Sequence, residues 1–475
     1  MKKGKVYIVG AGPGAEDLIT LRGLKVLQQC DVVIYDYLVN KEILKYTNPS
    51  CEIICVDELD KDKYSNGFSK RQDLINGLMV KKCKEGKNVV RLKNGDPSIF
   101  SRLNEELEVL KKNRIDFRII PGVSTFLAAG CYLGIPLTAR GISSQICITT
   151  GHETNLKQDG FVNWEYVSKL DTIVLYMAVE NLKNIIDKLI FHGKSKKTPV
   201  AVVSNISKIN QRYVIGTLDD IVEKIKDINL TAPAVVIIGD VVKKERLYNW
   251  FKKTKKILFT GLSSERFFEK GLIFHIPMIE IKELKNYKHL DDYIKKLILQ
   301  KNVDWIIFTS RYAVYYFFER LYDLGYDTRI LFGIKIAAIG SSTANRLKEY
   351  GIVCDLVPKR ECSLGLIDEF KKILKSSKQK VKIFLPRSDI ADKGLTEMLK
   401  KLGAIVYPCV VYKNVISKNL PEIDFSFFDE IIFSSPSCVK NFVKRYGVPP
   451  EKLKLKSIGK VTEKAVEMFI KKIKS

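Results

Sequence analysis

Long apolar runs are missing from this chain of 475 residues. A membrane-spanning helix needs about 18 or more consecutive apolar residues, and no stretch here approaches that length. The first residues, MKKGKVYIVGAGPG, reach a glycine-rich turn before a signal peptide is complete. The sequence therefore predicts a protein without a membrane partner, located in the cytoplasm.

Clustered cysteine and histidine are also missing. The 10 cysteines form no C-x-x-C pair, and the two closest, Cys51 and Cys55, have no histidine near them. Zinc sites and disulfide frameworks both need such spacing. We expect reduced thiols and no metal site.

Acidic residues are too few to balance the basic ones, so the net charge is +26. Nucleic-acid binding is one interpretation, because summed Lys and Arg contacts hold polyanions. However, most of the charge is lysine spread along helical stretches such as FKKILKSSKQK, without an arginine-rich tail. Long-range attraction would also concentrate a small polycarboxylate, which is the alternative partner.

Short apolar runs alternate with helical stretches throughout the chain, which predicts an α/β fold. The length favours two to four folding units. A charged stretch, KKERLYNWFKKTKK, separates the strand pattern VVIIGDVV from a new one, ILFTG. We therefore expect one domain at residues 1–250 and another at 254–475.

The second half contains an internal repeat. DWIIFTSRYAV at 304–314 is echoed by DEIIFSSPSCV at 429–439, and IAAIGSSTANRL at 336–347 is echoed by LKSIGKVTEKAV at 455–466. The repeat predicts two similar α/β lobes with a ligand site in the cleft between them. Most of the Ser and Thr side chains at these strand ends are expected to cap helices.

The stretch VYIVGAGPGAEDLITL at 6–21 satisfies the dinucleotide-binding pattern of glycines after a strand. Two features oppose a bound pyrophosphate. Pro13 removes one backbone donor, and the carboxylates of Glu16 and Asp17 repel a diphosphate. The turn therefore favours a neutral or cationic ligand.

Nine motifs follow one another in the first half, and their order is far more specific than any single one. They are GAGPG (10–14), YDYLV (35–39), VVRLKNGDPSIFSRLNEEL (89–107), IIPGVST (119–125), GIPLT (134–138), TTGHE (149–153), LYMA (175–178), TPVAVV (198–203) and TAPAVVIIGDVV (231–242). From residue 5 to about 245 the chain resembles the tetrapyrrole methylases, and among them the uroporphyrinogen-III C-methyltransferases. The resemblance implies a bilobed methylase domain that uses S-adenosyl-L-methionine, with the glycine turn lining the cofactor cleft.

The resemblance also assigns site residues by motif. Asp36 matches a proton acceptor and Lys63 a proton donor, Arg102 and Glu105 match a substrate-handling pair, and His152 matches a partner of a substrate carboxylate. A spacing of three residues predicts that Arg102 and Glu105 lie on one helix face, and the alternative role for this pair is an ordinary surface ion pair. The implied cofactor residues, among which Asp96 balances the sulfonium charge, are Pro13, Asn94, Gly95, Asp96, Ile99, Ser124, Thr125, Met177 and Ala178.

Three positions depart from the family pattern. Asn94 replaces the first glycine of GGDP, Ser101 begins SRLNEE where GRGGEE is usual, and Phe68 stands where histidine is common. Added side chains beside a cofactor-facing backbone predict weaker cofactor binding rather than a different reaction.

The second half, through the repeat units and KIFLPRSDIADKGLTEMLKKLGAIVYPCVVYKNV, resembles uroporphyrinogen-III synthases. The resemblance implies a bilobed α/β domain that closes hydroxymethylbilane while inverting its last ring. By motif the cleft residues are Thr343, Tyr412, Thr462 and Ser435. Tyr412 is interpreted either as a hydrogen-bond donor to the departing hydroxyl or as a tyrosine that packs at a strand end.

Together the two resemblances imply a bifunctional enzyme that makes uroporphyrinogen III from hydroxymethylbilane and methylates it twice to precorrin-2, toward sirohaem or cobalamin. A homodimer through the methylase domain is a further expectation, and no nucleic-acid partner is expected. The alternative function is an RNA-directed methyltransferase or nucleic-acid-binding protein of the same fold, which the basic surface favours.

Overall fold

Short runs rich in valine and isoleucine form the strands of this protein, because β-branched side chains favour extended backbone. A computed structural model describes residues 4–48, 50–58, 68–152, 161–263, 270–417 and 420–471. The chain divides into two compact units, Met1–Thr254 and Lys255–Ser475. Each is built of helices and sheets, so the predicted α/β class is confirmed.

The first sheet of unit 1 is parallel. Its central strand β4 (Val89–Lys93) pairs with β1 (Val6–Gly10) on one side and with β2 (Val32–Tyr35) on the other. Strands β3 (Glu52–Cys55) and β5 (Phe117–Ile120) form the edges of the part that the structure describes. Because the strands are parallel, the loops that follow β1, β2, β4 and β5 all leave the same edge of the sheet.

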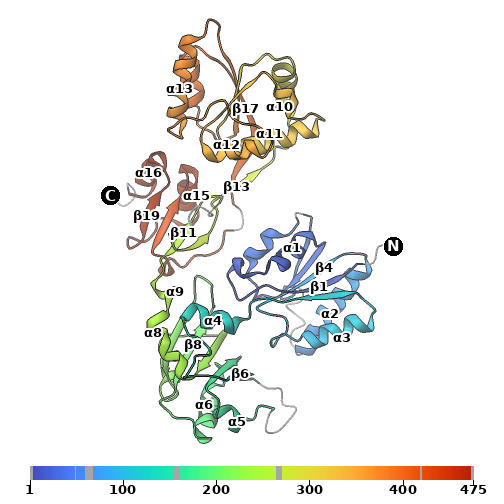
Figure 1. Ribbon diagram of the computed structural model, residues 1–475, viewed down its shortest axis with the longest axis vertical. Coiled ribbons are helices and arrows are strands. Elements are labelled where there is room, and N and C mark those ends of the chain that lie inside the picture. Colours follow the sequence, from blue (N-terminus) through green and yellow to red (C-terminus); the bar gives the residue numbers. More distant parts are fainter. Residues whose placement is uncertain are drawn as a thin grey trace. The chain divides into compact units, whose positions relative to one another are not determined.

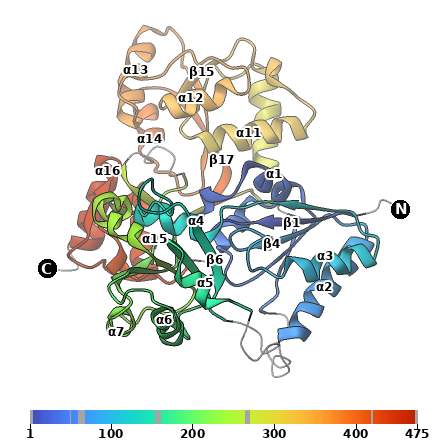
Figure 2. The ribbon, with the colours of Figure 1, turned by 60° about the horizontal axis from the view of Figure 1, so that its bottom comes forward.

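Helices cover both faces of this sheet (Figures 1 and 2). Helix α1 (Leu21–Gln29) packs on one face through the buried Leu27. Helices α2 (Phe68–Lys84) and α3 (Leu103–Lys112) pack on the other face through side chains such as Met79 and Leu110. The alternating residues of β4 therefore face two different cores.

The second sheet of unit 1 is mixed. Strand β10 (Ala234–Ile238) lies in its centre and runs antiparallel to β7 (Thr172–Tyr176) and to β8 (Pro199–Ser204). Strand β6 (Ile146–Thr150) pairs parallel with β7, and β9 (Arg212–Thr217) pairs antiparallel with β8. Strands β7 and β8 thus end at the same edge.

The faces of the second sheet are covered unequally. Helix α4 (Thr125–Leu133) packs on one face, next to the short helical segment Asp240–Lys244. The opposite core is formed with α5 (Trp164–Ser168), α6 (Leu182–Phe191) and α7 (Ile221–Asp227).

Unit 1 ends in two short helices, α8 (Glu245–Tyr248) and α9 (Trp250–Lys253). Phe251 is 3% exposed, and its ring centroid lies 5.5 Å from that of Tyr132 on α4. Trp250 Nε1 donates a hydrogen bond to the carbonyl of Cys131 at 2.8 Å. The charged stretch predicted to separate the domains is therefore helical and packs on the first unit.

Unit 2 contains two sheets in its described residues. The smaller one is parallel, and its strand order is β12 (Leu272–His275), β11 (Lys256–Phe259), β18 (Glu430–Phe433) and β19 (Lys454–Ser457). The larger one has the order β13 (Ile279–Lys282), β17 (Ile405–Ile416), β16 (Lys382–Ser388), β14 (Trp305–Phe308) and β15 (Lys335–Ala338), with only β13 antiparallel to its neighbour.

Helices follow these strands in regular alternation. In the chain segment of the larger sheet they are α10 (Lys288–Tyr293), α11 (Arg311–Asp323), α12 (Ser341–Lys348), α13 (Ser363–Ser376) and α14 (Gly394–Lys401). In the segment of the smaller sheet they are α15 (Pro436–Tyr446) and α16 (Lys460–Val466).

The structure confirms the internal repeat. In each copy a central strand, β14 or β18, continues into a long helix, α11 or α15, and pairs with the strand of the second motif, β15 or β19. The first residue of each copy makes the same contact. Asp304 Oδ2 accepts a hydrogen bond from Lys382 N at 2.7 Å, and Asp429 Oδ2 accepts one from Lys256 N at 2.8 Å.

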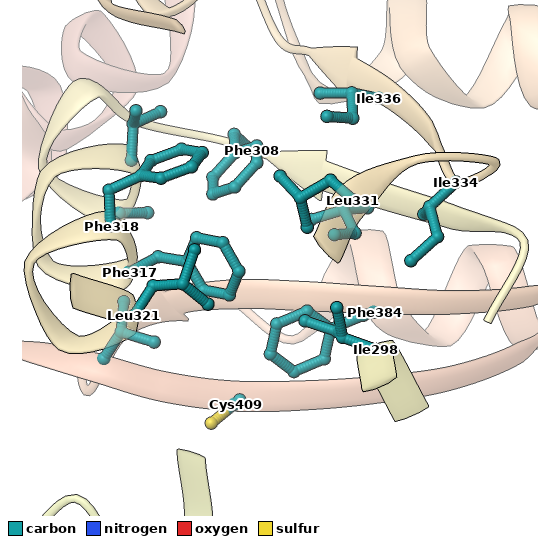
Figure 3. Close-up of a cluster of buried hydrophobic side chains, with 14 of the residues drawn as sticks. Ile298, Phe308, Phe317, Phe318, Leu321, Leu331, Ile334, Ile336, Phe384 and Cys409 are labelled. Atoms are coloured by element: carbon teal, nitrogen blue, oxygen red, sulfur yellow. The ribbon is translucent and has the colours of Figure 1, made fainter. Parts of the chain in front are cut away.

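Phenylalanine rings form the centre of the largest core in unit 2 (Figure 3). The ring centroid of Phe317 on α11 lies 5.5 Å from that of Phe308 on β14 and 6.1 Å from that of Phe384 on β16. These contacts fix α11, and with it the residue before the helix, on the sheet.

No helix within the described ranges is both long and apolar enough to cross a membrane.

Candidate active sites

Three backbone N–H groups in and beside the glycine turn after β1 are bonded inside the protein. Pro13 is buried and has no N–H group. The α-helix that follows begins only at Leu21, after a short 3-10 segment at Glu16–Leu18. Ala11 N donates to the carbonyl oxygen of Lys93 at 2.7 Å, and Gly12 N donates to that of Gly95 at 3.2 Å. Ala15 N donates to Ser207 Oγ at 2.8 Å. A pyrophosphate needs such groups free at a helix start, so this turn does not favour a dinucleotide.

Three glycines bring the ends of β1, β4 and β5 into direct backbone contact. A Cβ atom on Gly122 would lie 2.3 Å from the carbonyl oxygen of Gly95, and one on Gly10 would lie 2.6 Å from Gly122 N. Gly95 has φ +69°, and a Cβ there would lie 3.0 Å from Thr125 Oγ1. These contacts place the predicted cofactor residues Gly95 and Thr125 side by side.

Asp96 fixes the loop after β4. Its Oδ2 accepts a hydrogen bond from Gly122 N at 2.9 Å, and its Oδ1 accepts one from Ser98 N at 2.8 Å. Ile99 N donates to the carbonyl of Asp96 at 3.3 Å. The loop that carries Asn94 to Ile99 is thus held around a carboxylate, which suits a cationic ligand.

The second sheet reaches this loop through Tyr176 at the end of β7. The Tyr176 hydroxyl accepts a hydrogen bond from Phe126 N at 3.1 Å, and its ring centroid lies 5.2 Å from that of Phe100. Burial raises the pKa of Tyr176. Ser124, which precedes α4, is 5% exposed.

Met177 and Ala178 follow Tyr176 directly. Met177 has φ +51° and is 53% exposed, whereas Ala178 is fully buried. Phe100 and Arg102, in the loop after β4, also have positive φ, at 45° and 58°. Such conformations are unfavourable for non-glycine residues and persist only where the surroundings enforce them, often at ligand sites.

Asp36 follows β2 and is held by Arg91 of β4. Both Asp36 oxygens accept hydrogen bonds from Arg91 Nη2, at 2.9 and 2.8 Å. The Arg91 side chain is 3% exposed and that of Asp36 is 26% exposed. Arg91 therefore fixes the orientation of the Asp36 carboxylate, while part of the Asp36 side chain stays accessible to solvent.

The other predicted substrate residues are more exposed. The expectation that Arg102 and Glu105 share a helix face is wrong, because α3 begins only at Leu103. Arg102 precedes the helix and has a left-handed backbone conformation. Its Nε still donates to Glu105 Oε1 at 3.2 Å, and both side chains are nearly half exposed. His152 is exposed, and its backbone N donates to Thr150 Oγ1 at 3.2 Å. Lys63 lies outside the described residues, and Phe68 is the first residue of α2.

In unit 2, Tyr412 of β17 is buried against α11. Its hydroxyl shares a hydrogen bond with Ser310 Oγ at 3.0 Å, and its ring stacks on that of Tyr316 at 5.8 Å. Burial raises the pKa of Tyr412, while its bonds to Ser310 and Ser388 act in the opposite direction. The Tyr412 hydroxyl is thus buried in a polar pair with Ser310, which fits both interpretations of Tyr412.

The remaining predicted cleft residues lie at helix starts. Ser435 caps α15 by accepting from Cys438 N at 3.3 Å, as expected for most of these side chains. Thr343 and Thr462 are the third residues of α12 and α16, and they are 4% and 5% exposed. Glycines, Gly340 and Gly459, occupy the cap positions of those two helices.

Known proteins match both halves of the chain. The family described as Tetrapyrrole (Corrin/Porphyrin) Methylases matches residues 5–222, and the family described as Uroporphyrinogen-III synthase HemD matches residues 266–473. The porphyrin biosynthesis protein HemD of Ruminiclostridium josui is 32% identical over 490 residues, which cover 99% of this chain and 94% of that protein. This chain belongs to the tetrapyrrole methylases and continues as a uroporphyrinogen-III synthase domain.

Single-domain relatives match the methylase half. The uroporphyrinogen-III C-methyltransferase of Priestia megaterium is 43% identical over 240 residues, or 50% of this chain and 98% of that enzyme. A second match is the crystal structure of uroporphyrin-III C-methyltransferase from Thermus thermophilus complexed with S-adenyl homocysteine. The two sequences are 31% identical, the match covers 50% of this chain and 99% of that chain, and the TM-score is 0.43.

Sequence reasoning assigned no role to three side chains of these sites, Arg91, Ser310 and Tyr176. Arg91 lies in the run VVRLK, where a charged residue between apolar ones is a signal for a buried partner. Ser310 lies in the quoted repeat at the position equivalent to Ser435, so aligning the two copies identifies it. Tyr176 was included in the LYMA motif without a role of its own.

Proposed function

We propose that this chain cyclises hydroxymethylbilane to uroporphyrinogen III in unit 2 and methylates that product twice to precorrin-2 in unit 1. The observation that supports the proposal most strongly is the pairing of the two families in one chain, together with the similarity to a porphyrin biosynthesis protein that covers 99% of this chain and 94% of that protein. The net charge of +26 favours substrates with many carboxylates in both units.

The methylase residues fit S-adenosyl-L-methionine, which supplies an electrophilic methyl group when bound. Asp96 provides a fixed carboxylate near the glycine contacts of Gly95 and Gly122, where backbone approaches closely and side chains are excluded. The glycine turn has few free donors for a diphosphate. We assign cofactor binding to this loop with Pro13, Asn94, Ile99, Ser124, Thr125, Met177 and Ala178.

Methylation of a pyrrole carbon requires alignment of that carbon and removal of a proton afterwards. Asp36 is the proposed proton acceptor because its carboxylate is partly exposed and its orientation is fixed. Arg102 and Glu105, which are exposed near the same sheet edge, are the proposed contacts for the tetrapyrrole, with His152 and Lys63 as further candidates.

Cyclisation requires loss of a hydroxyl group from a linear substrate that is held folded. Tyr412 and Ser310 form a buried hydroxyl pair that can donate to the departing oxygen. Thr343, Thr462 and Ser435 are the proposed further contacts of this substrate.

The test supplies hydroxymethylbilane to the full chain under anaerobic conditions, with and without S-adenosyl-L-methionine. We expect the type III isomer without the cofactor and a product heavier by two methyl groups with it, read by mass and by porphyrin isomer after oxidation. Formation of only the type I isomer would refute the synthase assignment. Type III product that stays unmethylated with the cofactor present would refute the methylase assignment.

A further inference from the structure

Four charged side chains meet inside the methylase unit, beside the end of β2. They are Asp36, Arg91 and Lys93 of β4, and Glu106 of α3. The side chains of Arg91, Lys93 and Glu106 are 3%, 4% and 0% exposed. With two positive and two negative groups, the cluster is neutral as a whole.

Arg91 joins the two carboxylates. Its Nη2 donates to Asp36, its Nε donates to Glu106 Oε1 at 3.0 Å, and its Nη1 donates to the carbonyls of Ile34 and Leu92 at 3.4 and 3.3 Å. Lys93 Nζ donates to the same Glu106 oxygen at 2.7 Å. The guanidinium plane is thus fixed on every side.

This arrangement is costly for a strand in the middle of a parallel sheet, where apolar residues are usual. Buried charges are unfavourable even when paired, and apolar replacements are often at least as stable. Glu106 Oε2 is buried and has no hydrogen-bond partner among the described residues. Burial and the charge of Arg91 lower the pKa of Lys93. Stabilisation of the fold therefore does not explain why these four charged side chains lie together.

The cluster links three segments that carry predicted site residues. Strand β2 leads into Asp36, β4 leads from Lys93 directly into the cofactor loop that begins at Asn94, and Glu106 follows Glu105 on α3. A second ion pair, Asp57 with Arg71, lies beside the first segment, where Asp57 Oδ2 accepts from Tyr37 N at 2.7 Å. Only the Arg91 cluster contacts the Asp36 carboxylate among the contacts described.

We propose that Arg91 is a positioning residue for methylation, which orients the Asp36 carboxylate, and that Glu106 and Lys93 hold Arg91 in place. The inference rests on the proposed methylation. After methyl transfer the tetrapyrrole carries an extra positive charge. A carbon-bound proton then moves to a carboxylate oxygen of Asp36, and the C–H electron pair returns to the ring system and neutralises it.

A double-mutant cycle on kcat of the full chain tests this, with uroporphyrinogen III and S-adenosyl-L-methionine as substrates. Loss of a positioned acid–base group costs about 10²–10⁴-fold, which is the fall expected for Asp36→Asn. We expect Arg91→Gln to lower kcat by about 10–100-fold with unchanged affinity for S-adenosylhomocysteine. The double variant should be no slower than Asp36→Asn, because residues that act as a unit are not additive.

Arg320→Gln is the matched control. Arg320 also donates two hydrogen bonds to one carboxylate, from Nε and Nη2 to Asp291 at 2.8 Å each, whereas Arg91 contacts both Asp36 oxygens with Nη2 alone. Because Arg320 lies in unit 2, its loss should leave methylation unchanged. If Arg91→Gln is insoluble, Arg91→Lys, which keeps the buried charge but not the guanidinium that joins Asp36 to Glu106, replaces it in the same cycle.

Two results would overturn the inference: full kcat in the Arg91 variant, or a double variant slowed by the product of the two single effects. Both require an active wild-type chain. Absence of methylation by the wild type would instead refute the proposed function.

Discussion

The last helix of the methylase unit provides a quantitative test of where that unit ends. A fragment of residues 1–250 lacks most of α9, whereas a fragment of 1–254 retains it. Phe251 is 3% exposed and contacts Tyr132, so the shorter fragment loses a buried aromatic side chain. Removal of a buried Phe costs about 3–5 kcal/mol. Because small proteins have only about 5–15 kcal/mol of total stability, the loss is severe.

The assay is urea unfolding of both fragments, followed by tryptophan fluorescence and by circular dichroism. We expect the free energy of unfolding of 1–250 to be lower by about 3–5 kcal/mol, and 1–254 to bind S-adenosylhomocysteine. Phe251→Ala in the 1–254 fragment is the control and should reproduce most of the difference. Equal urea midpoints for the two fragments would refute the conclusion that α9 belongs to the core of the first unit.

Three further predictions concern the ligand, Tyr412 and pH. S-adenosylhomocysteine should raise the melting temperature of the chain while NAD does not, because a ligand specific to the folded state stabilises it; an equal shift with NAD would contradict the cofactor assignment. Tyr412→Phe removes the hydrogen bond to Ser310 and should lower the free energy of unfolding by about 0.5–1.5 kcal/mol, as measured by chemical denaturation. Isomer analysis should still find the type III product, and mainly type I product would instead show that the hydroxyl is essential. Arg320 lowers the pKa of Asp291 below its usual 3.8, so the ion pair stabilises the fold above pH 3.8 and its contribution is lost as the pH falls through the lowered pKa. The difference in melting temperature between wild type and Arg320→Gln should therefore shrink in acid. A constant difference would contradict this prediction.

Strands that are buried on both faces stand out in the sequence as continuous apolar runs. The run PVAVVS forms β8 and the run VVIY forms β2, and every residue of both strands is buried. Strands β3 and β5 escaped detection because they lie at sheet edges and carry exposed residues such as Ile53 and Arg118. An edge strand has no continuous apolar run to recognise.

Residues of the candidate sites were predictable where a motif carried them and not where only the fold joins them. Asp96 and Gly95 belong to one short motif, and the structure places both in one loop. Arg91 and Glu106 are 15 residues apart, and nothing in their spacing shows that a strand and a helix bring them together. Glu105 is predicted from its match to the family motif, and nothing in that motif indicates that the neighbouring Glu106 is buried.

The two copies of the repeat in unit 2 share a main-chain contact but differ in the side chains that begin their long helices. Asp304 and Asp429 each accept a hydrogen bond from the main-chain N–H of the residue that begins the neighbouring strand, Lys382 or Lys256. The residues after the capping serines differ, with Arg311 and Tyr312 in one copy and Pro436 and Ser437 in the other. The linear tetrapyrrole that we propose as substrate has two chemically different ends. Two similar lobes with unlike side chains can distinguish those ends, which a perfectly symmetric pair cannot.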